Sequence, residues 1–309
     1  MKKVIMIVGP TAVGKTFVSV EAAKRLDAEI ISADSMQIYR NMDIGTAKIR
    51  EDEKQGVTHH LIDIVDADES FTAAQYQTKA LSCIDDIFAR GRVPIVVGGT
   101  GLYINSLLYD MDFQSGVSDE ELRSSLWELY DKEGEEALFL KLRQLDPKKA
   151  EKIDRKNIKR VIRAIEIATY KDKNRDFSSD CPLREGYRFF LFVLTSPRTL
   201  LYERINERVL RMLDEGLVDE VSALISRFPL TRESQSMMGI GYRQVISYLE
   251  NEMTEEEMIE EVQKQSRRYA KRQLTWFKRY PQASWIEITN LSEEGEEVVD
   301  KIVNTFRSS

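Results

Sequence analysis

Residues 4–16 read VIMIVGPTAVGKT, an apolar run that leads directly into a glycine-containing turn. The turn, Gly9–Thr16 (the phosphate loop), matches the pattern G-x-x-x-x-G-K-[ST] in full. The apolar run predicts a buried strand before the loop, and a helix is expected to begin near Thr16. Backbone N–H groups in such a loop and the positive end of the helix dipole together cradle phosphate oxygens. The stretch therefore predicts a polyphosphate or diphosphate ester as the ligand.

The last two residues of the phosphate loop are expected to contact the phosphate and the metal ion. Lys15 is expected to reach the outermost phosphate as a point charge, and the Thr16 hydroxyl is expected to hold Mg²⁺. Gly9 and Gly14 allow the tight turn and the close approach of backbone to ligand. A turn that matches the pattern by chance is the alternative, which the strand before it and the helix after it disfavour. The predicted diphosphate-binding residues are Gly9, Pro10, Thr11, Ala12, Val13, Gly14, Lys15 and Thr16.

The composition describes an ordinary globular protein. A chain of 309 residues predicts about two domains, and 42% hydrophobic with 31% charged residues is enough for a proper core. Two widely separated cysteines suit a reducing cytoplasm, and the only histidines, His59 and His60, exclude a multi-histidine metal centre. The N-terminal apolar run is too short for a signal peptide and no stretch approaches a membrane span, so a cytoplasmic location is expected. The net charge of −7 by itself argues against nucleic-acid binding.

Polar residues follow the next expected strand. A helix over Thr16–Leu26 leads to the short strand Glu29–Ser32, and Asp34 and Gln37 come just after it. Because ligands bind at the carboxyl ends of the strands in an open α/β sheet, both side chains are expected beside the phosphate loop. The alternative is that they only cap the next helix.

A second glycine-rich turn follows a further buried strand. Ser70 is expected to cap a helix that runs to about Arg90, and the strand Arg92–Val97 then leads into Gly98–Gly101. Many P-loop NTPases end this kind of strand in an aspartate that holds Mg²⁺. Here the turn carries Thr100 instead, whose hydroxyl is placed to meet phosphate from the opposite side. Two such turns at one crevice favour a clamped leaving group over ATP hydrolysis.

The middle of the chain is charged and rich in helix formers. We expect an all-α insertion domain over residues 113–186, within a P-loop NTPase-like α/β core formed by residues 1–112 and 187–309. In that core, helices flank a parallel sheet. Expected helices of the insertion are Asp119–Tyr130, Glu135–Gln144, Pro147–Ile153 and Asn157–Tyr170. The last has an apolar face with Val161 and Ile162, and its basic side is of a kind that is usually only solvated.

The C-terminal part returns to the core with the strand Tyr187–Leu194. Further elements are expected at Arg198–Glu215, Val218–Arg227, Gly241–Leu249, Trp285–Thr289 and Glu294–Phe306. Thr254 caps a long helix whose first half is acidic and whose second half is basic, a polarity that the helix dipole alone explains. Tyr269, Trp276 and Phe277 interleave the basic half, which equally suits phosphate contact and base stacking.

Several segments, in this order along almost the whole chain, resemble the bacterial tRNA dimethylallyltransferases (tRNA isopentenyltransferases). They read GPTAVGKT, DSMQIY, GTAKI, HHLID, GGTGLY, N-x-x-R-x-x-R at Asn157–Arg163, GIGYRQ and KRQLTWFKR. The resemblance implies transfer of a dimethylallyl group from dimethylallyl diphosphate to the exocyclic amine of an adenosine. That adenosine lies 3′-adjacent to the anticodon in tRNAs that read U-initial codons.

The resemblance also implies roles for particular residues. Asp34 is the expected general base, with Lys15 and Thr100 as the other catalytic residues, because the amine must lose a proton and diphosphate must depart. The adenosine is expected to flip into the crevice. The expected tRNA-binding residues are Asp34, Ser35, Met36, Gln37, Thr100, Arg123, Lys159, Arg160, Val161, Ile162 and Arg163. The C-terminal basic helix would add phosphate contacts to the anticodon stem-loop.

Other expectations follow. Met238 is apolar where relatives carry arginine or glutamine near the diphosphate, and Arg243 is a candidate to supply that charge. Mg²⁺ is the expected cofactor, and a monomer without a protein partner or membrane contact is expected. A P-loop nucleotide or small-molecule kinase is the alternative enzyme, and a nucleotide-gated RNA-binding module without turnover is the alternative of another class.

Overall fold

The computed structural model describes residues 1–111, 113, 120–169 and 181–309. The chain divides into two compact units. The main unit comprises Met1–Leu108 and Glu185–Ser309, and the helical unit comprises Tyr109–Arg184. These boundaries lie within a few residues of the expected ones at 112/113 and 186/187. No helix in the described ranges is both long and apolar enough to cross a membrane.

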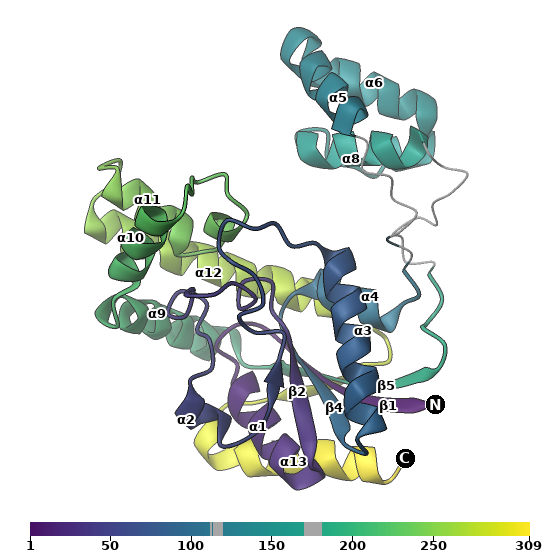
Figure 1. The fold of residues 1–309 in the computed structure, drawn as a ribbon, viewed down its shortest axis with the longest axis vertical. Coiled ribbons are helices and arrows are strands. Elements are labelled where there is room, and N and C mark those ends of the chain that lie inside the picture. The colour runs from purple at the N-terminus through teal and green to yellow at the C-terminus, as the bar shows by residue number, and fades with distance from the viewer. Residues whose placement is uncertain (112, 114–119, 170–180) are drawn as a thin grey trace. The chain divides into compact units, whose positions relative to one another are not determined.

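The main unit contains a six-stranded parallel sheet in the order β3-β2-β4-β1-β5-β6 (Figure 1). Its strands are β1 (Lys2–Val8), β2 (Ala28–Ala33), β3 (His59–His60), β4 (Val93–Gly98), β5 (Tyr187–Thr195) and β6 (Ser284–Glu287). All residues from Val4 to Val8 are fully buried, because helices cover both faces of a parallel sheet. The predicted fold class is confirmed.

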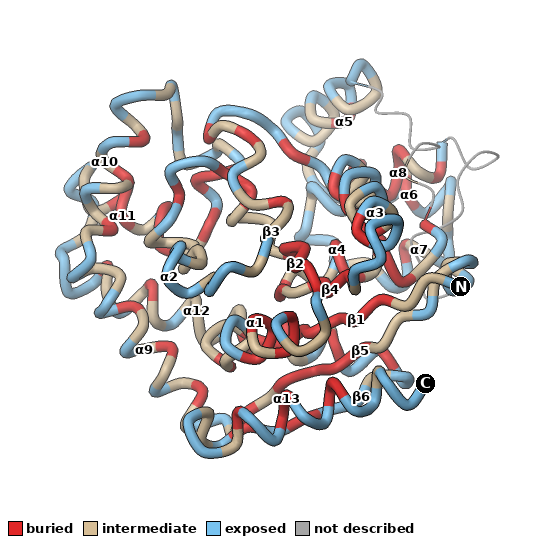
Figure 2. Tube along the Cα trace, turned by 60° about the horizontal axis from the view of Figure 1, so that its bottom comes forward, coloured by how far each residue is buried: buried red, intermediate tan, exposed pale blue. Residues whose placement is uncertain are grey.

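The helices of the main unit lie on both sides of this sheet, with α1 and α13 on one face and α3 on the other (Figure 1). They are α1 (Lys15–Leu26), α2 (Glu51–Lys54), α3 (Ala73–Ala89), α4 (Gly101–Leu108), α9 (Arg198–Asp214), α10 (Leu217–Arg227), the 3₁₀ helix Ser236–Met238, α11 (Tyr242–Leu249), α12 (Glu255–Phe277) and α13 (Leu291–Arg307). Figure 2 shows that α13 buries one stripe and exposes the other, as its apolar periodicity requires.

Most expected elements occur within a few residues of their predicted bounds, and the differences have local causes. Thr72, not Ser70, caps α3, since its side chain accepts from the Gln75 N–H in a capping box with Gln75. Thr254 caps α12 as predicted, through a capping box with Glu257. The elements α2, α4 and β3 were not expected, because very short or uniformly apolar segments show no periodicity.

In its described residues, the helical unit has four helices around its own small core. They are α5 (Glu120–Glu133), α6 (Glu135–Leu145), α7 (Pro147–Ala150) and α8 (Ile158–Thr169). The core is formed by leucines of α5 and α6 and by the apolar stripe of α8, which includes Val161, Ile162 and Ile165. No strand was predicted in this region, and its four described helices correspond to those predicted. The helices α5 and α6 extend a little beyond their predicted C-terminal ends, whereas α7 and α8 are shorter than predicted. The predicted end residues Asp119 and Tyr170 lie outside the described residues.

Candidate active site

The phosphate loop connects β1 to α1 at the carboxyl edge of the sheet. Gly14 is the N-cap of α1 and has φ of 98°, a conformation that strains any residue with a side chain. Because α1 begins at Lys15, its unpaired N–H groups and the positive end of its dipole lie at the loop. The local sequence thus builds an anion-binding site before any distant residue contributes.

Lys15 is held at the loop by backbone oxygens. Its Nζ donates to the Gly9 carbonyl oxygen at 3.0 Å and to the Pro10 carbonyl oxygen at 2.7 Å. Burial and the neighbouring Arg208 lower the pKa of Lys15 to about 7, while Asp34 opposes that shift. A phosphate bound beside Lys15 would stabilise the charged ammonium form of this side chain.

A cavity of about 670 Å³ in the main unit joins the phosphate loop to the end of β2. The expected residues that line it are Thr11, Ala12, Val13, Gly14, Lys15, Thr16, Asp34, Ser35, Met36 and Gln37. Residues that were not expected there include Ala47, Arg208, Tyr269, Arg272 and Gln273. Gly9, Pro10 and Thr100 are not among the residues that line the cavity. One cavity therefore holds both a phosphate cradle and a carboxylate.

Asp34 directly follows β2 and is mostly shielded from solvent. Burial raises the pKa of its carboxyl group, and the Met36 N–H and the Lys15 ammonium partly oppose that effect. The Asp34 Oδ1 accepts from the Met36 N–H at 2.9 Å, which fixes the side chain at the start of the turn. A raised pKa makes the carboxylate a stronger base, which suits it to accept a proton.

Thr100 is engaged with the turn that carries Asp34. Its Oγ1 accepts from the Ser35 N–H at 3.0 Å and donates to the Ser35 Oγ at 3.3 Å. Parallel pairing of Ala33 with Gly98 sets this proximity, because β2 and β4 end at the same level. In this structure the Thr100 hydroxyl is bonded to Ser35, and its contact with phosphate stays a prediction.

Gln37 also has its polar atoms occupied within the protein. Its Nε2 donates to the carbonyl oxygens of Thr46 and Ala47, both at 3.3 Å, and its Oε1 accepts from the Ser32 hydroxyl at 3.2 Å. The loop that supplies those carbonyls is held in turn by Glu220 of α10. The Glu220 carboxylate accepts from three consecutive backbone N–H groups, at 2.8, 2.7 and 3.1 Å, and from the Tyr242 hydroxyl at 2.6 Å; those N–H groups belong to Asp43, Ile44 and Gly45.

Two side chains missed by sequence reasoning reach the phosphate loop from distant helices. Arg208 of α9 donates to the Thr11 hydroxyl at 3.3 Å, and Gln273 of α12 accepts from the Thr11 N–H at 3.0 Å. No local pattern marks either residue, because their positions depend on how α9 and α12 pack on the sheet. Gln273 belongs to the quoted segment KRQLTWFKR, and this was the only available signal.

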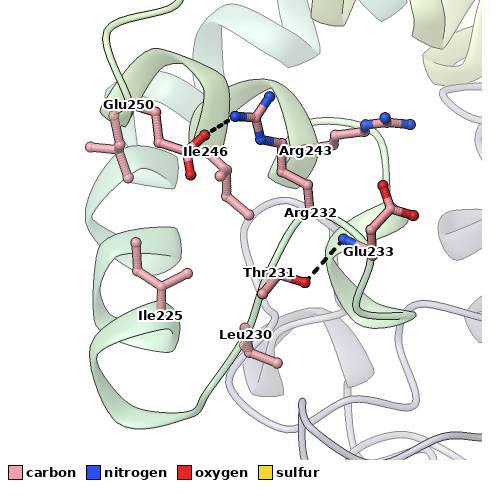
Figure 3. Close-up of a pocket in the computed structure, with 9 residues that line it drawn as sticks. Ile225, Leu230, Thr231, Arg232, Glu233, Arg243, Ile246 and Glu250 are labelled. Atoms are coloured by element: carbon pink, nitrogen blue, oxygen red, sulfur yellow. Dashed lines mark hydrogen bonds and ion pairs between the residues drawn. The ribbon is translucent and has the colours of Figure 1, made fainter.

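Arg243 does not line the cavity at the phosphate loop. It lines a separate cavity of about 500 Å³ between α10 and α11, together with Arg232, which pairs with Glu250 (Figure 3). Met238 does line the cavity at the phosphate loop and is 52% exposed. The proposed replacement of charge by Arg243 is therefore wrong, and Arg208 is the arginine bonded to the phosphate loop.

The basic half of α12 presents unneutralised charge. Lys271 and Arg272 of α12, and Lys278 and Arg279 of the turn that follows it, are exposed. None of the four has an ion pair with an acidic side chain in the described ranges. Arg272 lies over the Tyr269 ring at 5.6 Å, and Arg279 lies over the Trp276 ring at 4.7 Å. Cations and aromatic rings on one helix suit a phosphate backbone with unstacked bases.

The expected RNA-binding residues of the helical unit fall into three kinds. Arg123 and Arg163 both pair with Glu166, at 2.7 and 2.9 Å, and Glu166 is only 1% exposed. Lys159 and Arg160 are exposed at the start of α8 and make no ion pair with another described residue. Val161 and Ile162 are 1% and 2% exposed in the core, so their side chains cannot contact RNA, and that assignment is corrected.

Magnesium fits the cavity only together with a phosphate ligand. No cluster of three or more His, Cys, Asp or Glu side chains that could hold a metal occurs in the described part of the chain. Thr16 lines the cavity next to Lys15, and β4 ends at Gly98 without an aspartate. Mg²⁺ commonly binds through few protein ligands, waters and substrate phosphates, so this donor set suits an ion shared with a diphosphate.

The fold and the site define a P-loop α/β protein whose phosphate cradle shares a cavity with a shielded carboxylate. A family model described as IPP transferase matches residues 37–280. A tRNA dimethylallyltransferase of Alkaliphilus metalliredigens is 48% identical over 100% of this chain and 99% of its own length, and one of Clostridioides difficile is 46% identical over 99% and 100%. The chain belongs to the IPP transferase family, that of the tRNA dimethylallyltransferases.

Solved structures agree with this assignment. The full-length tRNA isopentenylpyrophosphate transferase of Bacillus halodurans superposes with a TM-score of 0.74 at 43% identity, covering 100% of this chain and 98% of that one. A eukaryotic dimethylallyltransferase acting on tRNA gives a TM-score of 0.82 at 27% identity, covering 100% of this chain and 80% of that one. The agreement in fold therefore extends to a eukaryotic relative.

Proposed function

We propose that this enzyme transfers a dimethylallyl group from dimethylallyl diphosphate to tRNA and releases diphosphate. The acceptor is the exocyclic amine of the adenosine 3′-adjacent to the anticodon in tRNAs that read U-initial codons. The single observation that carries the chemistry is the cavity that contains both the phosphate loop and Asp34. The names of the relatives support the substrates.

The diphosphate end of the reaction belongs to the phosphate loop. As the bond between the allylic carbon and the diphosphate oxygen breaks, negative charge develops on the leaving group. The N–H groups at the start of α1, the Lys15 ammonium and the Arg208 guanidinium are the donors available to it. Thr16 would hold Mg²⁺ against the same oxygens, and the ion would neutralise part of that charge.

The acceptor end of the reaction belongs to Asp34. The adenine amine forms the new bond to the allylic carbon and loses one proton, which the Asp34 carboxylate accepts. A base within a stacked anticodon loop cannot reach a cavity, so the adenosine must flip out of its stack. Ser35 and Met36 line the cavity beside Asp34 and would contact the flipped nucleotide. Gln37 would first have to release Thr46 and Ala47.

Contacts to the tRNA backbone are proposed on two surfaces, each considered by itself. The exposed basic half of α12 supplies cations and rings in the main unit. In the helical unit, Lys159 and Arg160 supply cations at the N-terminal end of α8, where the helix dipole favours phosphate. Arg123 and Arg163 share one buried glutamate, so they contribute less free charge. We propose a monomer as the active form.

Transfer itself is tested with dimethylallyl diphosphate labelled in the prenyl carbons, Mg²⁺ and unmodified tRNA. The proposal predicts label in tRNA, located after nuclease digestion on the adenosine next to the anticodon. A matched transcript with that adenosine replaced by guanosine should accept no label. Absence of label from both tRNAs, with ATP consumed instead, would overturn the proposal in favour of a kinase.

A further inference from the structure

Gln273 of α12 connects the two glycine-rich turns of the main unit. Its Oε1 accepts from the Thr11 N–H of the phosphate loop at 3.0 Å, and its Nε2 donates to the Gly99 carbonyl oxygen at 3.0 Å. The residue is only 5% exposed, so water competes little for either bond. One amide group therefore spans the two turns and satisfies a donor on one and an acceptor on the other.

The fit between Gln273 and the second turn leaves no spare room. A Cβ atom at Gly99 would lie 2.1 Å from the Gln273 Nε2, so a side chain there would displace the Gln273 amide from this position. The Thr11 N–H is consumed by Gln273 and is not available to a phosphate. This hydrogen bond to a distant side chain fixes the position of the phosphate loop.

The second turn carries this constraint to the expected general base. Thr100 follows Gly99 and donates its backbone N–H to the Ala33 carbonyl oxygen at 3.1 Å, while its hydroxyl accepts from the Ser35 N–H at 3.0 Å. Asp34 lies between Ala33 and Ser35 in the sequence. Gln273 is therefore linked through Gly99 and Thr100 to the turn of Asp34, and directly through Thr11 to the loop that would hold the leaving group.

We infer that Gln273 is a positioning residue that sets the distance between the diphosphate site and Asp34. This inference rests on the proposed function. In a displacement reaction, the attacking amine and the departing diphosphate lie on opposite sides of one carbon. A misplacement of either by about 1 Å can lower the rate about a hundredfold. Gln273 acts through the two turns, and its amide performs no step on the substrate.

The test replaces Gln273 with glutamate and with methionine. Gln273→Glu keeps the shape and the acceptor for Thr11 but removes the donor to Gly99, and Gln273→Met keeps the length and removes both bonds. Gln263→Glu is the matched control, since it lies on the same helix, adds the same charge and loses a bond to the Asn206 carbonyl oxygen, away from both turns.

The measurements are the single-turnover rate of prenyl transfer, the Kd values for inorganic diphosphate and unmodified tRNA, and the melting temperature. Both Gln273 variants should lose roughly a hundredfold in single-turnover rate, while each Kd stays within about threefold of the Gln263→Glu value. A single-turnover rate within threefold of the control, or failure of both variants to fold, would assign Gln273 a structural role only and overturn the inference. A wild type that transfers no prenyl group would contradict the proposed function instead.

Discussion

Lys15 and Arg208 place two cations in the cavity at the phosphate loop, and burial, together with the Arg208 guanidinium, lowers the pKa of the Lys15 ammonium to about 7. The Lys15 ammonium donates to the Gly9 and Pro10 carbonyl oxygens of its own loop. A bound diphosphate would stabilise the charged form and raise that pKa again. This relationship links diphosphate binding to proton uptake.

The linkage gives a pH dependence with a definite sign. Below about pH 7 Lys15 is already protonated, whereas above it the free enzyme must take up a proton on binding, so affinity for dimethylallyl diphosphate should weaken as the pH rises above 7. Calorimetry at pH 8 in buffers of different ionisation enthalpy should show an uptake approaching one proton. The Lys15→Arg variant keeps its charge and should show less uptake, and equal values for the two proteins would contradict the linkage.

Arg208 should contribute directly to diphosphate affinity. Removing a charged donor from a partly buried anion site costs about 1.5–3 kcal/mol, so Arg208→Met should raise the KM for dimethylallyl diphosphate roughly 10- to 100-fold. The same change should move the pKa of Lys15 upward, because the neighbouring charge is gone. Arg211→Met, on the same helix but exposed and outside the cavity, is the control. Equal KM values for the two variants would exclude Arg208 from the site.

Glu220 should stabilise the loop that holds Gln37. The variant Glu220→Gln replaces one acceptor oxygen by an NH₂ group that faces backbone donors, at a cost of about 1–3 kcal/mol. Hydrogen exchange of the amides of residues 43–47 should accelerate and stability to urea should fall. Glu215→Gln removes only an exposed ion pair at 3.9 Å and should have little effect. Unchanged exchange in Glu220→Gln would show that the loop keeps its conformation without this carboxylate.

Glu29 should make stability depend on acid pH. This buried carboxylate pairs with Arg90, Arg92 and His60, and hydrogen bonds from these side chains lower its pKa from 4.5 to about 2 against the opposing effect of burial. A depressed pKa stabilises the fold above about pH 4.5, and that contribution, about 3 kcal/mol, is lost as the pH falls towards 2. In denaturant titrations at pH 7, Glu29→Gln should have a lower free energy of unfolding than the wild type. Between pH 5 and pH 3 the variant should lose less of that free energy than the wild type, because it lacks the carboxylate that takes up a proton. Parallel pH profiles of the two proteins would refute this account.

The sequence predicted what depends on local pattern. The phosphate loop, the helix after it and the strand ends that bring Asp34 to the site all follow from apolar runs and glycine positions. Gln273 lies 262 residues from Thr11 along the chain, and Arg208 lies 197 residues away, so no local signal could place them. Their positions depend on helix packing, which sequence periodicity does not determine.

In the helical unit, the structure corrects a prediction of RNA-binding residues. The periodicity of α8 correctly predicted an apolar face with Val161 and Ile162, yet the resemblance also assigned both residues to RNA binding. Burial decides against that assignment, because a side chain enclosed by α5 and α6 cannot also face a ligand. Lys159 and Arg160, which lie just before them, remain the predicted RNA contacts of this helix.

The central claim is that Asp34 accepts the proton of the adenosine amine. The most direct measurement is the single-turnover rate of prenyl transfer to unmodified tRNA by Asp34→Asn, which keeps the size and a hydrogen-bonding acceptor but removes the base. The account predicts a loss of roughly a hundredfold or more, with the Kd values for inorganic diphosphate and tRNA within about threefold of wild type. Transfer by Asp34→Asn at a rate within threefold of wild type would contradict it.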